Sequence, residues 1–277
     1  MATLYPRAEF DPLGPQTAPR LRTHDIVCLH TMAGTFDNTD SMFHERGYRG
    51  TESHFGVAGS GRLKQWQDLD FQADANGDGN HRCISIETAD KGESFPQWAG
   101  SDVPDWTNAQ IDVIVDLVGW LCETYDIPRA LVPDSRPGHR GIAYHRLGVP
   151  HSTGDPDAPG GPWLVSGGEL WTESVGKVCP GDRRIAQLKA IVIPRLQGRR
   201  MMRAATTQSE EDDMFTFSTT GRPVYFVAAG KAVGLNELTD LEAIRTSVRP
   251  APLPHFQLDE DTFNQFIKVF RDGGTSV

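Results

Sequence analysis

The sequence predicts an α/β fold in which a mixed central β-sheet carries helices on both faces, followed by a small α+β module. Over residues 1–197, short apolar stretches typical of strands alternate with stretches of helical spacing. Two of the expected strands are separated by a short glycine turn, whereas the other connections are long, so we expect both antiparallel and parallel pairing. Near residue 198 the composition changes, and a second strand-rich segment follows.

The elements of residues 1–197 begin after a proline-rich arm that we expect to pack on the surface. Ile26–His30 is predicted as a buried strand, because apolar residues precede its final histidine without interruption. A short helix, a hairpin around a Gly-Ser-Gly turn and a further strand are expected next. Their ranges are Asp37–Arg46, His54–Ala58 with Leu63–Gln67, and Cys83–Glu87.

The helix predicted over Thr107–Tyr125 has the strongest pattern in the chain. Its apolar residues recur at helical spacing, Thr107 and Gln110 form a capping-box signature at its start, and Pro128 follows its end. Three further segments complete this part of the chain: a short strand over Gly141–His145, a long loop over His151–Gly168 and a closing helix over Asp182–Leu196.

The last third of the chain is predicted to be separate from the first part. Residues 198–213 combine clustered charges with small polar side chains and show no periodicity, which is typical of a linker. Strand-like runs follow over 214–235, and two helices are expected near Glu237–Thr246 and Asp259–Phe270. The predicted organisation is therefore a domain at 1–197, a linker at 198–213 and a small module at 214–277.

Composition excludes several classes of protein. A chain of 277 residues can bury a core without disulfides, and its net charge of −10 argues against general affinity for nucleic acid. No apolar run approaches the roughly 18 residues of a spanning helix, so no membrane insertion is expected. The N-terminus lacks the basic and apolar segments of a secretory signal peptide. Cys28, Cys83 and Cys122 are interpreted as buried hydrophobic residues in a reducing cytoplasm.

Two histidines and one cysteine are the candidate metal ligands. His30 and His145 each end an expected strand, where sheet edges commonly build sites, and Cys179 lies in the turn-like segment GKVCPGD. Two imidazoles and one thiolate suit Zn²⁺ and leave a fourth position for water, which is the catalytic arrangement. His139 is the alternative second histidine, but it follows Pro137-Gly138 and not an apolar strand.

The segment Asp74–Gly79 imitates the start of a calcium-binding loop. Ser85 occupies the position that should carry the closing glutamate, and no helix is expected beside the segment. We therefore interpret it as a solvated turn.

Five fragments, in this order, resemble the type 2 zinc N-acetylmuramoyl-L-alanine amidases, which include peptidoglycan recognition proteins. They are LHTMAG, SHFGVAGSGRLKQ, CISIET, AYHR and GKVCPGD, and the likeness covers roughly residues 24–197. The long loop and the GGELW segment before GKVCPGD are most similar to endolysins of phages that infect actinobacteria. The resemblance implies the amidase/peptidoglycan recognition protein fold, a peptidoglycan substrate and cleavage of the amide between N-acetylmuramic acid and L-alanine.

Carried over position by position, the resemblance places zinc ligands at His30, His145 and Cys179. It implies that Lys177 stabilises the transition state and that Glu87 serves as acid and base. Ser53 stands where some phage relatives have a tyrosine, so that tyrosine's auxiliary role would fall to Glu87 or His54. This departure from the family pattern leaves the assignment between those two residues open.

An endolysin would remain in the host cytoplasm until its release to the cell wall, and its C-terminal module would bind that wall. Two other functions compete with this interpretation. One is a peptidoglycan-binding protein of the same fold without catalysis, and the other is a cell-wall cysteine peptidase with Cys179 as nucleophile.

Overall fold

The chain forms two compact units, residues 1–196 and 197–277. The computed structural model describes residues 3–90, 102–198, 215–218, 224–228, 231–235, 255–257 and 260. The predicted linker lies outside the described residues except at its first position, and the two predicted C-terminal helices lie outside them except at Glu260. Among the described residues, no helix is both long enough and apolar enough to cross a membrane.

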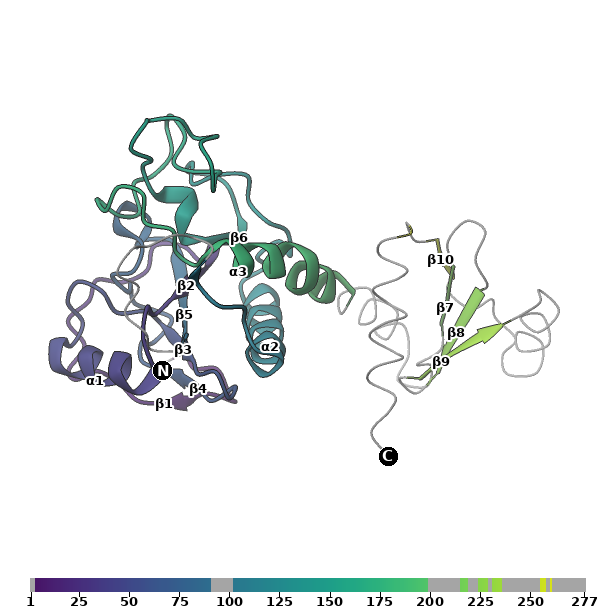
Figure 1. The fold of residues 1–277 in the computed structure, drawn as a ribbon. Coiled ribbons are helices and arrows are strands. Elements are labelled where there is room, and N and C mark those ends of the chain that lie inside the picture. The colour runs from purple at the N-terminus through teal and green to yellow at the C-terminus, as the bar shows by residue number, and fades with distance from the viewer. Residues whose placement is uncertain are drawn as a thin grey trace. The chain divides into compact units, whose positions relative to one another are not determined.

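The first unit is built on a mixed six-stranded sheet with the order β1-β4-β3-β5-β2-β6 (Figure 1). Only the β3–β4 hairpin is antiparallel, and the other neighbouring strands are parallel. The strands are β1 (Glu9–Phe10), β2 (Ile26–Thr31), β3 (Phe55–Val57), β4 (Leu63–Gln65), β5 (Cys83–Thr88) and β6 (Gly141–Tyr144). The predicted combination of one hairpin with parallel crossovers is therefore confirmed.

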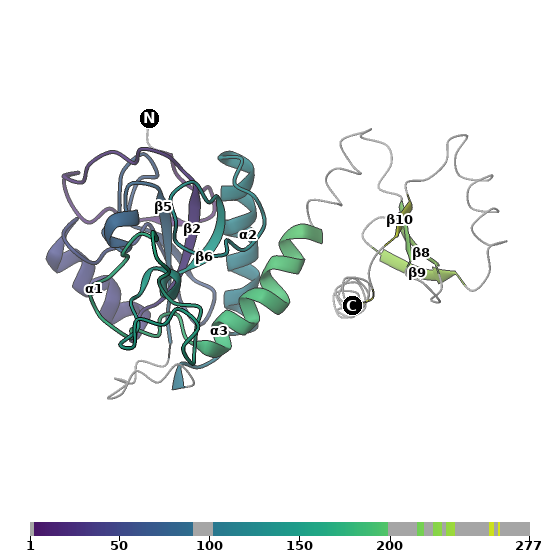
Figure 2. The ribbon, with the colours of Figure 1, turned by 90° about the horizontal axis from the view of Figure 1, so that it is seen from above.

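Helices cover both faces of this sheet (Figure 2). One face carries α2 (Asn108–Thr124) and α3 (Asp182–Gln187), and α1 (Phe36–Arg46) lies on the other side. The helix α2 has the predicted capping box between Thr107 and Gln110, and its apolar stripe packs into the main core. The predicted mixed sheet with helices on both faces is confirmed.

The face that carries α1 has its own small apolar cluster. Phe36 and Phe43 of α1 pack on the indole of Trp66, which follows β4. That ring lies directly on Gly56 of β3, where a Cβ atom would stand 2.1 Å from the ring. The glycine is required here because any side chain would displace the indole.

Three details differ from the sequence prediction. The N-terminal arm contributes β1, which is too short to show periodicity and is held by parallel pairing with β4. The strand β6 ends at Tyr144, and His145 begins a 3₁₀ turn over His145–Gly148. The closing helix continues from α3 into a π-helical turn over Leu188–Val192.

The second unit contains a four-stranded sheet with the order β10-β7-β8-β9. Pairing from β7 through β9 is antiparallel, whereas β10 runs parallel to β7. The strands β7 to β9 fall within the run predicted to be strand-rich, and β10 was not predicted. Their bounds are Phe215–Ser218, Val224–Ala228, Lys231–Leu235 and His255–Gln257.

Candidate metal centre

The two central parallel strands place His30 and Glu87 side by side. In the register between β2 and β5, His30 is opposite Glu87. Paired residues of neighbouring strands point to the same face, and alternation directs both side chains away from the face covered by α2. The His30 Nδ1 and Glu87 Oε1 atoms are 3.9 Å apart.

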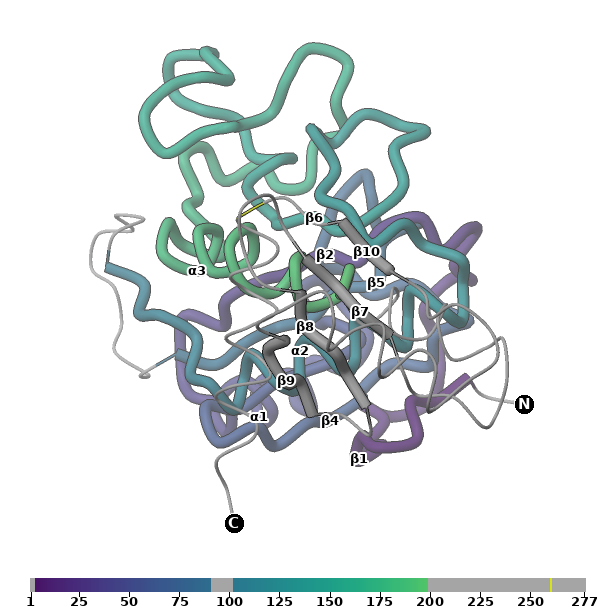
Figure 3. The backbone as a smooth tube through the Cα atoms, turned by 90° about the vertical axis from the view of Figure 1, so that its right-hand side faces the viewer, coloured from purple at the N-terminus to yellow at the C-terminus, as the bar shows by residue number. Residues whose placement is uncertain are grey.

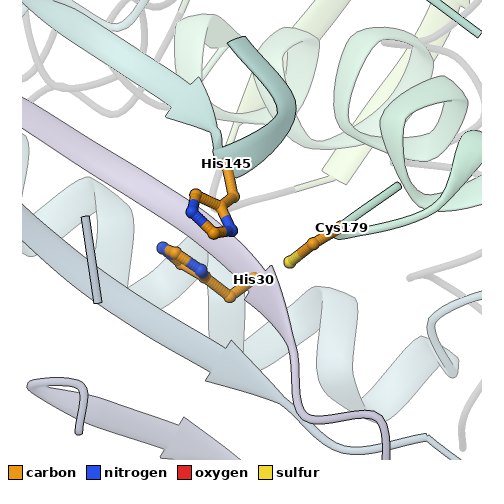
Figure 4. Close-up of side chains that lie close together, drawn as sticks. All are labelled: His30, His145 and Cys179. Carbon is orange, nitrogen blue, oxygen red and sulfur yellow. The ribbon is translucent and has the colours of Figure 1, made fainter. Parts of the chain in front are cut away.

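His30, His145 and Cys179 come together from three separate segments. One potential ligand atom from each lies within 4.8 Å of the others, and all three side chains are buried. The imidazole centroids are 4.5 Å apart, and the sulfur of Cys179 points toward the two rings (Figure 4). The three predicted metal-ligand candidates therefore form one cluster.

A second cluster of possible metal ligands in the described part of the chain is acidic, and it does not resemble a metal site. Asp11, Asp40 and His44 lie close together, but the ammonium of Lys64 binds both carboxylates at 2.5 and 2.7 Å. A lysine already supplies the positive charge there.

The segment that carries Cys179 is anchored beside His145. It belongs to the long connection between β6 and α3, which loops beyond one end of the sheet without regular strands (Figures 1 and 3). The backbone N–H of Arg146 donates to the Cys179 carbonyl at 3.0 Å, and the Arg146 guanidinium binds Val178 O and Asp182. The thiol sulfur accepts the backbone N–H of Thr31 at 3.3 Å.

Each imidazole uses its Nε2 atom in a hydrogen bond that faces away from the cluster. His145 Nε2 lies 3.2 Å from the carbonyl oxygen of Trp171, and His30 Nε2 lies 3.3 Å from the Asn76 side-chain oxygen. With these oxygens as acceptors, both rings carry the proton on Nε2. The Nδ1 atom of His145 is buried with no partner among the described residues. An orphaned lone pair beside a thiol and a second imidazole fits a metal ion.

Burial sets the protonation states that a metal ligand needs. It lowers the pKa of His145 to about 3, with the charge of Lys177 as the second cause, and it lowers the pKa of His30 well below its usual value. Both rings are therefore neutral. Burial also raises the pKa of the Cys179 thiol to about 12, and Lys177 opposes this rise. A bound cation reverses that preference, because metal coordination deprotonates a thiol.

Glu87 and Lys177 flank the cluster. Burial raises the pKa of Glu87 to about 7, and the charges of Lys177 and Arg184 oppose the rise. Glu87 Oε2 is buried without a hydrogen-bond partner among the described residues. Lys177 is partly exposed, and its charge acts on Glu87 and on all three members of the cluster.

The remaining sequence candidates lie apart from the cluster. His139 is partly exposed and its ring faces Asp134 at 3.3 Å. His54 is buried on the same face of the sheet, where it contacts Ser85 Oγ and the Phe71 carbonyl, and burial lowers its pKa to about 4. Its hydrogen bonds indicate a structural role.

Two residues beside the centre escaped the sequence analysis. Arg184 of α3 is buried and binds Thr31 and Thr88, the last residues of β2 and β5, at 2.9 and 2.7 Å. Its only signal in the sequence is a charge within the predicted closing helix. Asn76 lies in the segment predicted as a solvated turn, but its side chain is buried against His30. Nothing in the sequence pattern distinguishes it from the exposed residues of that turn.

A family comparison decides the wider identity of this chain. Residues 20–158 match the family described as N-acetylmuramoyl-L-alanine amidase, and the matched segment contains His30, Glu87 and His145. The chain belongs to the N-acetylmuramoyl-L-alanine amidase family. The prediction of a hydrolase of this family is thus confirmed, and the family's members are typically zinc enzymes that act on muramyl peptides. Lys177 and Cys179 lie beyond the matched residues.

Solved structures are similar to this amidase at low sequence identity. The hydrolase AmiA of Staphylococcus aureus shares 16% identity over 52% of this chain and 68% of its own, with a TM-score of 0.41. The amidase LysC of Clostridium intestinale shares 12% over 67% and 97%, with a TM-score of 0.44. Drosophila PGRP-LB shares 16% over 64% and 86%, with a TM-score of 0.40. No curated protein matches the chain significantly.

Proposed function

We propose that this amidase cleaves the amide between the lactyl group of N-acetylmuramic acid and L-alanine with a zinc ion held by His30, His145 and Cys179. The observation that carries the proposal is the buried, unpartnered Nδ1 of His145, in a residue that clusters with His30 and Cys179 so that one possible ligand atom of each lies within 4.8 Å of the others. When bound, zinc would supply a Lewis acid for the scissile carbonyl and a water molecule of lowered pKa.

Glu87 is the proposed acid and base. Its Oε1 atom lies 3.9 Å from His30, and its Oε2 atom is buried without a partner in the described part of the chain. An unpartnered carboxylate oxygen beside the centre is free to take a proton from the attacking water and return it to the leaving amine. Burial raises the pKa of Glu87 above that of an exposed carboxyl, and the positive charge of a bound zinc ion would lower it again.

Lys177 is the proposed partner of the negative charge that develops on the substrate oxygen. Its ammonium is the only lysine charge that acts on Glu87, His30, His145 and Cys179 together in the described part of the chain. A cation at such a place stabilises the tetrahedral oxyanion, commonly by a few kcal/mol.

The burial of Cys179 favours a ligand over the nucleophile of a cysteine peptidase. The residue is fully buried, and its sulfur accepts a backbone hydrogen bond from Thr31. Burial also raises the pKa of this thiol to about 12, whereas the nucleophile of a cysteine peptidase is a thiolate.

Analysis of digested cell walls tests this proposal. We expect new L-alanine amino termini without new reducing sugar ends, together with one zinc per chain. A chelator should abolish the release, and added Zn²⁺ should restore it. Release of reducing ends would indicate a glycosidase, and full activity of metal-free protein would reject the zinc mechanism.

We also propose that the enzyme acts as an endolysin, kept in the host cytoplasm until release, with residues 214–277 binding the cell wall. The sequence resemblance to actinobacterial phage endolysins and the separate C-terminal unit support this role. A second binding unit would raise the local concentration of the catalytic unit at the wall. Protein cut after Gln197 should still hydrolyse soluble muropeptides but should no longer sediment with intact walls. Unchanged sedimentation would reject the binding role.

A further inference from the structure

Asn76 has an unusual position for an asparagine at the start of a helical turn. It precedes the 3₁₀ turn Gly77–Gly79, where an asparagine side chain ordinarily caps the turn's free N–H groups. Here the side chain makes no capping hydrogen bond and is 1% exposed. Burying an amide in this way is costly unless both of its ends are hydrogen-bonded.

Both ends of the Asn76 amide contact residues of β2. The oxygen Oδ1 lies 3.3 Å from His30 Nε2, and Nδ2 donates to Cys28 Sγ at 3.2 Å. Cys28 and His30 are two residues apart on the same face of β2, so the amide spans one step of the strand. The contact with Cys28 turns the oxygen, and not the NH₂ group, toward the imidazole.

The turn that carries Asn76 is fixed from two sides. The backbone N–H of Asn76 donates to Asn80 Oδ1 at 2.6 Å, and the backbone N–H of Asp78 donates to the Leu170 carbonyl at 2.9 Å. A Cβ atom at Gly77 would stand 2.7 Å from Leu170 O, and one at Gly79 would stand 2.5 Å from the Trp171 indole nitrogen. The turn is thus packed tightly on the segment whose Trp171 carbonyl accepts from His145.

We propose that Asn76 is a positioning residue for the zinc ligand His30: its side-chain oxygen accepts the Nε2 proton and so directs the Nδ1 lone pair into the metal centre. This rests on the proposed zinc function. A ligating histidine ordinarily donates its other N–H to an oxygen, and loss of that acceptor weakens metal binding 10- to 100-fold. His145 has the equivalent acceptor from a backbone carbonyl, which no substitution removes.

Zinc affinity of Asn76 variants, measured on the full chain by competition with a chromophoric chelator, tests the inference. Asn76→Leu keeps the size of the side chain but has no oxygen, and its zinc dissociation constant should rise roughly 10- to 100-fold. Asn76→Asp keeps an oxygen at the same place and should stay within a few-fold of the wild type. If Asn76→Leu does not fold, Asn76→Ala replaces it as the variant without a side-chain oxygen, and its zinc dissociation constant is compared with that of Asn76→Asp.

Two further measurements separate the role of the oxygen from a structural role. In ¹⁵N-histidine spectra of zinc-loaded wild type, His30 should carry its proton on Nε2. Asn80→Ala removes the hydrogen bonds of Asn80 to Asn76 N and to Asp74 but leaves the Asn76 amide in place, so its zinc affinity should remain near that of the wild type.

The outcomes distinguish this inference from the proposed function. Wild-type protein that binds no zinc would reject the metal centre itself. Wild-type protein that binds zinc, with Asn76→Leu binding it equally well, would reject the role of Asn76 alone. The role would also be rejected if Asn76→Asp lost as much affinity as Asn76→Leu, or if Asn80→Ala did, because turn conformation would then set the affinity.

Discussion

The two faces of the central sheet are both buried, but they are filled by different chemistry. Toward α2, the strands present aliphatic side chains such as Leu29 and Ile86, which join the apolar stripe of one helix in the main core. Toward the metal centre, the alternate positions of the same strands present His30, Ser85 and Glu87. Adjacent residues of one strand thus serve stability on one side and chemistry on the other.

The difference lies in how each face is completed. Apolar surface needs only other apolar surface, which α2 and the closing helix supply together. Buried polar groups need individual partners. The partner of the His30 imidazole is Asn76, 46 residues away, and the backbone N–H of Thr31 donates to the sulfur of Cys179, 148 residues away. Changes on the two faces should therefore separate stability from activity.

The largest effect is expected from removal of the thiol. Cys179→Ala should lose most of the bound zinc and most of the wall-degrading activity, because it removes one of the three proposed ligands. Cys179→Asp supplies a charge and a lone pair at a similar bond length, so it should keep substoichiometric zinc and roughly 1–10% of the activity. Metal analysis alongside turbidity loss of cell walls measures both. An aspartate variant that binds zinc normally and is inactive would favour Cys179 as nucleophile.

On the opposite face, Ile114→Ala should lower stability without changing the chemistry. Ile114 is fully buried in the core between α2 and the sheet, and such truncations cost about 2–5 kcal/mol. Urea unfolding should show this loss, while the zinc dissociation constant stays unchanged. Asp112→Ala on the exposed side of the same helix is the matched control, with an expected change below about 0.5 kcal/mol. A weakened zinc site in Ile114→Ala would show that the two faces are coupled.

Glu87→Gln and Lys177→Met should have the opposite effect to Ile114→Ala, because they change the chemistry and not the stability. Each should lower turnover roughly 100-fold, equivalent to about 2.7 kcal/mol in the activation barrier, while zinc remains bound. Neither side chain is among the three clustered ligand candidates. Steady-state hydrolysis of soluble muropeptide, combined with zinc content, measures both properties. Wild-type turnover in either variant would remove that residue from the mechanism.

The same contrast explains what the sequence could predict. The helix α2 was predicted almost to its ends, because apolar spacing and a capping box are local patterns. His30, His145 and Cys179 were found through residue chemistry and family resemblance, and the structure places them together. Asn76 and Arg184 were missed because their role depends on contacts with distant segments. The strand β1 was missed because two residues carry no periodicity.

The smallest expected effect concerns His54, a polar residue on the face of the candidate metal centre that lies outside the cluster of candidate ligands. Burial lowers its pKa from 6.5 to about 4, so protonation favours the unfolded chain. Its contribution to stability is therefore complete above about pH 6.5 and is lost progressively as the pH falls toward 4. Between pH 8 and pH 5.5 the loss should be about 1–2 kcal/mol.

Comparison with His54→Gln isolates this contribution. The variant keeps hydrogen-bonding groups near Ser85 and Phe71 but cannot be protonated in this range. Its free energy of unfolding should therefore fall less than that of the wild type between pH 8 and pH 5.5. Both proteins are measured metal-free, so that acid-induced zinc release does not contribute and the titration of His30 and His145 cancels in the difference. Equal slopes would mean that His54 is accommodated in its charged form, and that this part of the polar face tolerates charge without a metal.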